Sequence, residues 1–159
     1  MYARIIVKDF GEMKVKLDEN IKITTDNFIN ICSRGLYKNS SFHRIISGFM
    51  IQGGKVNVPL KPIKGEFKSN GFDNPILHKR GVISMARTMV KDSATSQFFI
   101  CHKDAPHLDS DYAAFGYMVS GFEVLDKIAN VETDYYDAPI KEVIIENIIL
   151  EENLWKDFY

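Results

Sequence analysis

Apolar and polar residues alternate in residues 2–8 and again from Met13 to Leu17, a pattern typical of extended strands. Successive side chains of a strand point to opposite faces, so a period of two predicts half-buried strands. A turn at Asp9–Glu12, in which Gly11 suits a hairpin, separates two such strands. The residues on the apolar face are Ala3, Ile5, Val7, Met13, Val15 and Leu17. A chain that begins with this hairpin must bury one face of a sheet.

Short runs of β-forming residues recur along the rest of the chain, at 42–46, 49–53, 81–86, 97–101, 113–118 and Ile140–Leu150. Two segments have helical spacing instead. The first has an apolar face within 28–36 and a cap at Thr24, Thr25 or Asp26. The second follows Ser120, which forms a capping-box pattern with Glu123. Many strands with one early and one late helix predict a mainly β fold, a closed antiparallel barrel capped by two α-helices, because closure removes exposed strand edges.

The chain of 159 residues contains no linker, repeat or low-complexity block. We therefore expect one domain over 1–159, with 151–159 as a C-terminal tail. Leu154, Trp155 and Phe158 could pack this tail onto the body. A monomer is expected, because a closed barrel leaves no free edge for another copy.

Cysteine usage, charge and hydropathy indicate the cellular compartment of the protein and the partners it would not bind. Cys32 and Cys101 lie far apart in apolar stretches and form no CxxC pair, which fits buried thiols in a reducing compartment. No apolar leader or membrane-length run occurs, and the formal net charge is −1. The histidines and aspartates of 102–109 match no structural zinc spacing, so we expect no metal. These features predict a cytoplasmic protein that binds neither membrane nor nucleic acid.

Two segments concentrate the residue types of a small-ligand pocket. They are SFHRIISGFMIQGG at 41–54 and, within 81–100, GVISMAR and SQFFI. Met50 and Gln52 share one face of a strand, as do Gln97 and Phe99, so each strand places an amide beside a large apolar group. Phe49 would reach the same place from the preceding turn. An apolar floor with a few converging polar groups is how such a pocket is built.

Each of these residues alone usually has a structural role. A Phe or Met in a strand is usually core, a lone arginine is usually solvated, and His43 is more often a structural histidine than a catalyst. The density of the pattern argues otherwise, because Arg, Gln, Phe and Met fall within nine positions without a carboxylate that could pair with Arg44. This density predicts a functional site.

These segments closely resemble the signature of the cyclophilin-type peptidyl-prolyl cis-trans isomerases. The matching runs are FHRIISGFMIQGG, GVISMAR and SQFFI, continued by Asp104–Asp109 and Ala113–Gly116. The resemblance extends from about Ile5 to Leu150, and Ile63–Phe67 and Tyr112–Phe115 are similar to the bacterial single-domain type. It implies an eight-stranded antiparallel barrel with a helix closing each end. It also implies isomerisation of Xaa-Pro bonds, without a cofactor, in proline-containing peptides and in unfolded or nascent proteins.

The same resemblance assigns roles to residues by matching position. Arg44 would be the catalytic arginine, and Gln52 would contact the substrate backbone. The remaining positions would line the proline pocket (Phe49, Met50, Phe99, Leu108), bind substrate through the main chain (Ala86, Arg87), close the rim (His107, Tyr112) or support the arginine (Gln97).

The sequence departs from the family pattern at several positions. His107 replaces a tryptophan common in eukaryotic members, which predicts weak cyclosporin binding. Tyr112 replaces a histidine in a way that is compatible with activity. The segment 55–62, with two prolines, replaces a Gly/Thr-rich loop and puts the preference for the residue before proline in doubt. Thr95 stands where glycine is usual, which would allow a strained turn.

Two other functions fit the same residues. A binding or scaffold protein could keep the pocket to capture proline-containing segments, although the presence of Arg44 with Gln52 and the full apolar set favours catalysis. A general folding assistant, acting on nascent chains, overlaps with the isomerase and is not separable from it by sequence.

Overall fold

The N-terminal hairpin forms as its alternation predicts. Strands β1 (Tyr2–Val7) and β2 (Gly11–Leu17) pair antiparallel, with Ala3 opposite Val15 and Ile5 opposite Met13. The six residues of the predicted apolar face are at most 3% exposed. The connecting turn uses positive backbone φ at Asp9 (67°) and Gly11 (121°), and the second value suits glycine.

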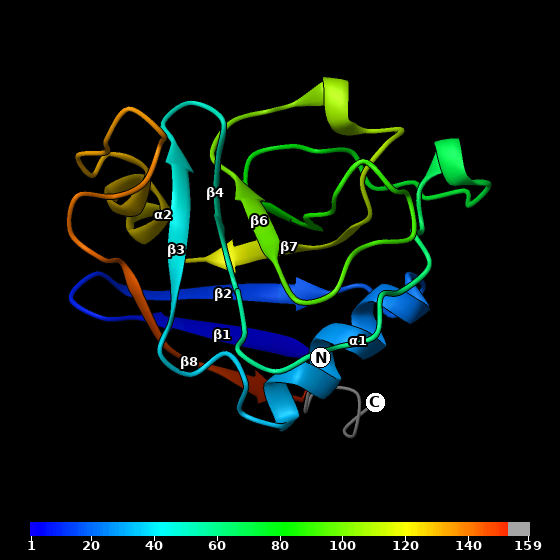
Figure 1. The fold of residues 1–159 in the computed structure, drawn as a ribbon, viewed down its shortest axis with the longest axis horizontal. Helices are drawn as coiled ribbons and strands as arrows, with labels where there is room; N and C mark the ends of the chain where they lie inside the picture. The colour runs from blue at the N-terminus through cyan, green and yellow to red at the C-terminus, as the bar shows by residue number, and fades with distance from the viewer. Residues whose placement is uncertain (153–159) are drawn as a thin grey trace.

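Eight strands form a closed antiparallel barrel in the computed structural model, which describes residues 1–152 (Figure 1). The order around the barrel is β1-β2-β7-β5-β6-β4-β3-β8, and β8 pairs with β1 to close it. The other strands are β3 (Ser40–Ile46), β4 (Met50–Gly53), β5 (Val82–Met85), β6 (Phe98–Cys101), β7 (Ala114–Ser120) and β8 (Ile144–Glu151). The expected eight-stranded barrel is confirmed.

Two α-helices, α1 (Lys22–Ser33) and α2 (Phe122–Ala129), lie at opposite ends of the barrel in Figure 1. Short 3-10 helices occur at Lys68–Asn70 and Pro106–Leu108. Among the described residues, no helix has the length and apolar character needed to cross a membrane.

The caps predicted for both helices are wrong. Helix α1 begins before Thr24 and Thr25, which are buried inside it. The Thr24 amide and hydroxyl both donate to the Glu66 carboxylate, at 2.6 and 2.7 Å, so the cap comes from a residue far along the chain. At α2, Ser120 is still paired in β7, and Gly121 turns the chain at a φ of 91°, so no capping box forms.

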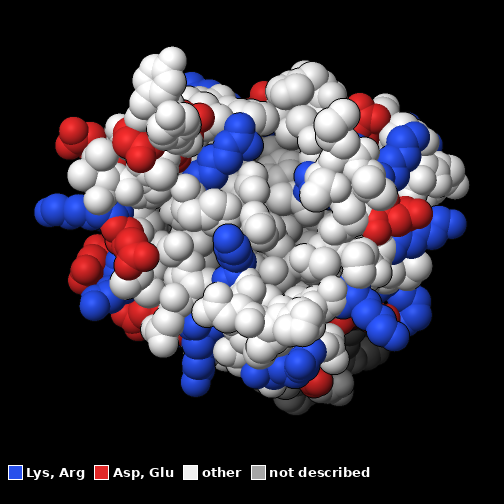
Figure 2. All heavy atoms as spheres, viewed as in Figure 1, with Lys and Arg blue, Asp and Glu red and all other residues white. Residues whose placement is uncertain are grey.

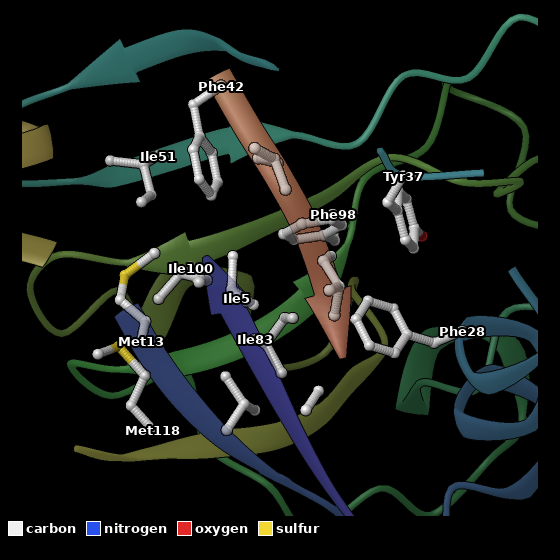
Figure 3. Packing of buried hydrophobic residues seen from close by; sticks show 14 of the residues in the cluster. Ile5, Met13, Phe28, Tyr37, Phe42, Ile51, Ile83, Phe98, Ile100 and Met118 are labelled. Carbon is white, nitrogen blue, oxygen red and sulfur yellow. The ribbon is translucent and has the colours of Figure 1, made fainter. Parts of the chain in front are cut away.

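The barrel interior is an apolar core into which α1 inserts an aromatic ring. Phe28 of α1 meets Phe98 of β6 edge-on at 5.7 Å between ring centroids and Tyr37 at 5.5 Å. Figure 3 shows these rings beside the aliphatic side chains of the strands. Large buried aromatic rings contribute much apolar area, so this contact fixes α1 on the barrel end.

The turn at Thr95 and the segment 151–159 were the subject of two further predictions. The strained turn suggested at Thr95 is absent, because Thr95 has no positive φ and its carbonyl accepts a hydrogen bond from Asn27 Nδ2 at 2.8 Å. Of the expected tail, Glu151 ends β8. Leu154, Trp155 and Phe158 lie outside the described residues.

Candidate active site

Four adjacent strands align the main polar and aromatic residues of the site in one row. Arg44 of β3 lies opposite Gln52 of β4, Gln52 lies opposite Phe99 of β6, and Phe99 lies opposite Ser84 of β5. Residues directly opposite each other on neighbouring strands present their side chains on the same face. The alternate residues Ile45, Ile51, Phe98 and Ile100 belong to the barrel core. The row therefore faces outward from the barrel wall.

The segment after β6 covers this outer face. Its Leu108 and Ala105 pack with Met50, Phe99 and Cys101 in a second apolar cluster, separate from the barrel core. Phe49, Ala86 and Tyr112 pack partly buried against the same cluster. Apolar side chains from β4, β6 and the segment after β6 therefore pack together and form a floor on this face.

A cavity of about 150 Å³ opens at this place. Its lining residues are Arg44, Phe49, Met50, Gln52, Ala86, Arg87, Phe99, Leu108 and Tyr112. Sites for drug-sized ligands usually measure about 300–1,000 Å³, so this cavity suits a single small ring or side chain. In Figure 2 the corresponding face is hollowed near its middle, with Lys or Arg side chains beside the hollow and acidic side chains towards its edges.

The two remaining predicted residues contact the lining without belonging to it. Gln97 Oε1 accepts a hydrogen bond from Gln52 Nε2 at 3.2 Å. The His107 ring lies against the Phe49 ring, with centroids 5.5 Å apart. The structure therefore brings together all eleven predicted residues, nine in the lining and two directly behind or beside it.

The two arginines of the lining differ in their partners. Arg87 is anchored, because its Nε and Nη2 donate to the Asp111 carbonyl at 3.0 and 2.6 Å, and its guanidinium lies 4.7 Å from the centre of the Tyr112 ring. Arg44 is exposed, and no carboxylate of the described residues lies within 4.0 Å of its guanidinium. Its hydrogen-bond donors are available to a bound molecule.

Sequence reasoning missed the support beneath the floor. His78 is buried behind Phe99, with Nδ1 3.0 Å from Asp109 Oδ1 and Nε2 2.9 Å from Ser84 Oγ. Burial lowers the pKa of His78. The one available signal was Ser84, a polar residue within the apolar run of β5.

His43 lies outside the lining of this cavity. A bulge between Phe42 and Arg44 takes it out of the β3–β4 pairing. Its Nδ1 is buried without a hydrogen-bond partner among the described residues, and burial lowers its pKa.

A larger cavity, of about 500 Å³, lies beside the β1–β2 turn and includes Phe10, Val131 and Ile140 in its lining. It contains none of the predicted site residues. The smaller cavity on the barrel wall is therefore the one at which the sequence motifs converge.

A closed β-barrel defines the fold, and its outer wall carries a small cavity with apolar side chains at its floor and an arginine and an amide at its edge. Residues 2–149 match the family model described as cyclophilin type peptidyl-prolyl cis-trans isomerase/CLD. The chain belongs to this family of isomerases.

Bacterial relatives cover most of the chain. It is 38% identical to peptidyl-prolyl cis-trans isomerase A of Dickeya dadantii, over 90% of this chain and 81% of the relative. It is also 38% identical to peptidyl-prolyl cis-trans isomerase B of Escherichia coli, over 89% and 95% of the two chains. Among solved structures, a cyclophilin type isomerase of Cryptosporidium parvum, crystallised in the presence of the dipeptide Ala-Pro, matches with a TM-score of 0.84. It is 31% identical, and the match covers 96% of this chain and 100% of the other.

Proposed function

We propose that this chain catalyses rotation about Xaa-Pro bonds by seating the proline ring in the cavity on the barrel wall and stabilising the twisted amide with Arg44. The observation that carries the proposal is the position of Arg44, at the edge of a ring-sized cavity with an apolar floor and without a carboxylate partner among the described residues. Phe49, Met50, Phe99 and Leu108 would hold the ring.

The proposed chemistry follows from amide resonance. The planar amide is held by a rotation barrier of roughly 18–20 kcal/mol, because the nitrogen lone pair is delocalised into the carbonyl. Midway through rotation the conjugation is lost, and the proline nitrogen becomes a hydrogen-bond acceptor. A guanidinium is permanently charged and planar, so it binds this twisted state better than either planar state. Binding the transition state more tightly than the ground state is catalysis.

The surroundings of Arg44 support this role. A proline ring seated on the apolar side chains of the cavity would displace water from around Arg44, which would strengthen the interaction of the cation with the amide nitrogen. Gln52 lies opposite Arg44 and is held by Gln97, so it would bind the substrate backbone from a fixed position. The main chain at Ala86 and Arg87 would bind the peptide on the far side, and His107 and Tyr112 would close the rim. No nucleophile, general base or metal is needed.

Substitution of Arg44 tests the proposal. Arg44→Ala should lower kcat/KM on a proline peptide by about 100-fold, since loss of one preorganised donor has this order of effect. Arg44→Lys keeps the charge without the planar fork and should recover only part of the activity. Arg34→Ala, which removes an exposed arginine outside the lining, is the matched control. Near wild-type turnover in Arg44→Ala would refute the mechanism, and peptide binding without any catalysis by the wild type would favour a scaffold protein.

We further propose a role on unfolded or nascent chains, as a single-domain monomer in the cytoplasm. Cys32 and Cys101 are free and buried, which supports a reducing compartment. The closed barrel supports a monomer because β8 and β1 complete each other's hydrogen bonds. Refolding of a proline-limited protein with and without the chain, together with its mass in solution, tests these points.

A further inference from the structure

His102 links the cavity wall to helix α2 through both nitrogens of its ring. It follows the end of β6, and its side chain is only 9% exposed. Nδ1 accepts a hydrogen bond from the Gly48 amide at 2.8 Å. Nε2 lies 3.0 Å from Oδ1 of Asp126, a residue of α2. The Gly48 amide can only donate, so Nδ1 is unprotonated and the ring proton is on Nε2.

The Gly48 contact is part of the turn that carries Phe49. The Phe49 amide closes this turn on the Ile46 carbonyl at 3.0 Å, and Gly48 has a φ of 81°. The Phe49 carbonyl accepts a hydrogen bond from the His102 amide at 2.8 Å. His102 therefore holds the turn through one main-chain hydrogen bond and one hydrogen bond of its ring. Phe49, which follows Gly48 in this turn, lines the cavity.

The opposite side of the ring is held by a charged pair. Arg80 donates to both oxygens of Asp126, at 2.7 and 3.0 Å, and to the His102 carbonyl at 3.0 Å. The hydrogen bonds from Arg80 lower the pKa of Asp126, so this carboxylate stays ionised and accepts a hydrogen bond from His102 Nε2. Arg80 also lies over the Phe122 ring at 5.3 Å, which ties the pair to the start of α2.

We propose that His102 is a positioning residue for the isomerase site, whose neutral ring holds the Gly48 amide and so fixes Phe49 against the bound proline. A proton added at Nδ1 removes the acceptor and places two donors face to face, which releases the side-chain anchor of the turn. The site is thus coupled to pH through a residue that does not touch the substrate. This inference rests on the proposed function, because it assigns Phe49 a role in holding proline.

The charged groups around the His102 ring have opposite effects on the protonated form of the ring. Asp126, from α2, stabilises the protonated ring, while Arg80, from the segment before β5, opposes it. Lys103 and Asp104, which follow His102, line the same open hollow and carry opposite charges.

Two amide substitutions separate the contacts of the ring. In His102→Asn the side-chain oxygen lies near the position of Nδ1, so it can accept from Gly48 but cannot reach Asp126. In His102→Gln the amide nitrogen lies near the position of Nε2, so it can donate to Asp126 but offers Gly48 no acceptor. Both variants lose the imidazole and cannot gain a proton at neutral pH.

The first experiment measures kcat and KM of the wild type and both variants on a proline peptide from pH 8 to pH 5.5. At pH 8 we expect His102→Gln to lose about three- to tenfold in kcat/KM, mainly through KM, because one hydrogen bond is lost. His102→Asn should stay within about twofold of the wild type. On acidification the wild type should lose activity relative to His102→Asn. Equal activity of the two variants at pH 8, or the same pH profile in the wild type and His102→Asn, would overturn the proposal.

A second experiment does not depend on catalysis. Amide hydrogen exchange at Gly48, followed by NMR, should be about tenfold faster in His102→Gln than in His102→Asn, with thermal unfolding to confirm that both variants fold. Equal exchange in the two variants would overturn the positioning role. A wild type that is inactive on every proline peptide would refute the proposed function, while the exchange difference would still decide whether His102 anchors the turn.

Discussion

The ring of His78 stacks on the ring of Phe99, with centroids 6.0 Å apart and an angle of 18° between the planes. Phe99 is the floor of the cavity, and His78 is fixed behind it by Asp109 and Ser84. The face that would hold proline is therefore supported by a hydrogen-bonded side chain as well as by apolar packing. Disrupting the stacking of His78 on Phe99 should therefore lower both the free energy of unfolding and the affinity for substrate.

The free energy of unfolding should fall on acidification, in part because of His78. Burial lowers the pKa of His78 in the folded state, and the Asp109 contact offsets only part of this effect. Between the folded pKa and the unfolded value of about 6.5, the unfolded chain binds more protons. The contribution of neutral His78 to the free energy of unfolding is therefore fully present above about pH 6.5. It is lost as the pH falls from there towards the folded pKa.

Urea unfolding of the wild type and His78→Gln from pH 8 to pH 5 checks this prediction. The variant should be less stable at pH 8 and should lose less stability on acidification. It should keep some pH dependence, because burial also lowers the pKa of His43. The same slope in both proteins would contradict a buried, neutral His78.

Phe98 and Phe99 are neighbours on β6 that face opposite sides of the barrel wall, so they form a matched pair. Phe98 packs in the barrel core, and Phe99 lines the cavity. Leucine in place of either ring should destabilise the fold by about 1–3 kcal/mol, since a buried ring is replaced by a smaller side chain. Only Phe99→Leu should also raise KM, by several-fold.

Chemical denaturation and steady-state kinetics on both variants separate the two effects. Phe98→Leu serves as the control for stability loss without loss of the floor. If KM rises equally in both, the cavity wall does not bind substrate through Phe99, and the assignment of the proline site fails.

The architecture and the lining of the cavity were predictable because they follow from local rules and from motifs. Alternation in Ala3–Leu17 specifies which face of the first hairpin is buried, whatever the rest of the chain does. The row from Arg44 to Phe99 depends on strand pairing, which alternation alone does not give. The resemblance to a known family predicted that these residues share one site, and the structure shows the strand pairing that aligns them.

The parts that could not be predicted depend on partners distant in the sequence. Glu66 caps α1 from 42 residues beyond Thr24, so a cap chosen from neighbouring residues was bound to be wrong. His78 and Asp109 are 31 residues apart, and Gly48 and His102 are 54 apart. Their spacing carries no periodic signal, because loops rather than strands bring them together.

Gln52 and Gln97 should act on catalysis as one unit. Their side-chain amides are hydrogen bonded at 3.2 Å, and only Gln52 lines the cavity. Gln97→Ala should therefore lower kcat/KM by about threefold to tenfold by releasing Gln52. In a double-mutant cycle, Gln97→Ala should have little further effect once Gln52 is alanine, because contacting residues are not additive. Additive effects in kcat/KM would show that Gln97 does not act through Gln52.

Cyclosporin should bind weakly, and His107→Trp should strengthen the binding. The imidazole of His107 lies against Phe49 at the rim, with an angle of 34° between the rings. An indole at this place would add apolar contact area and keep an N–H donor, the combination that makes tryptophan effective at interfaces. We expect about a tenfold gain in affinity, equivalent to about 1.4 kcal/mol. Tyr136→Trp, at a residue 82% exposed and outside the cavity lining, is the control for adding an indole elsewhere. Inhibition of the unmodified protein at nanomolar cyclosporin would show that the rim does not need tryptophan, and the role assigned to His107 would have to be abandoned.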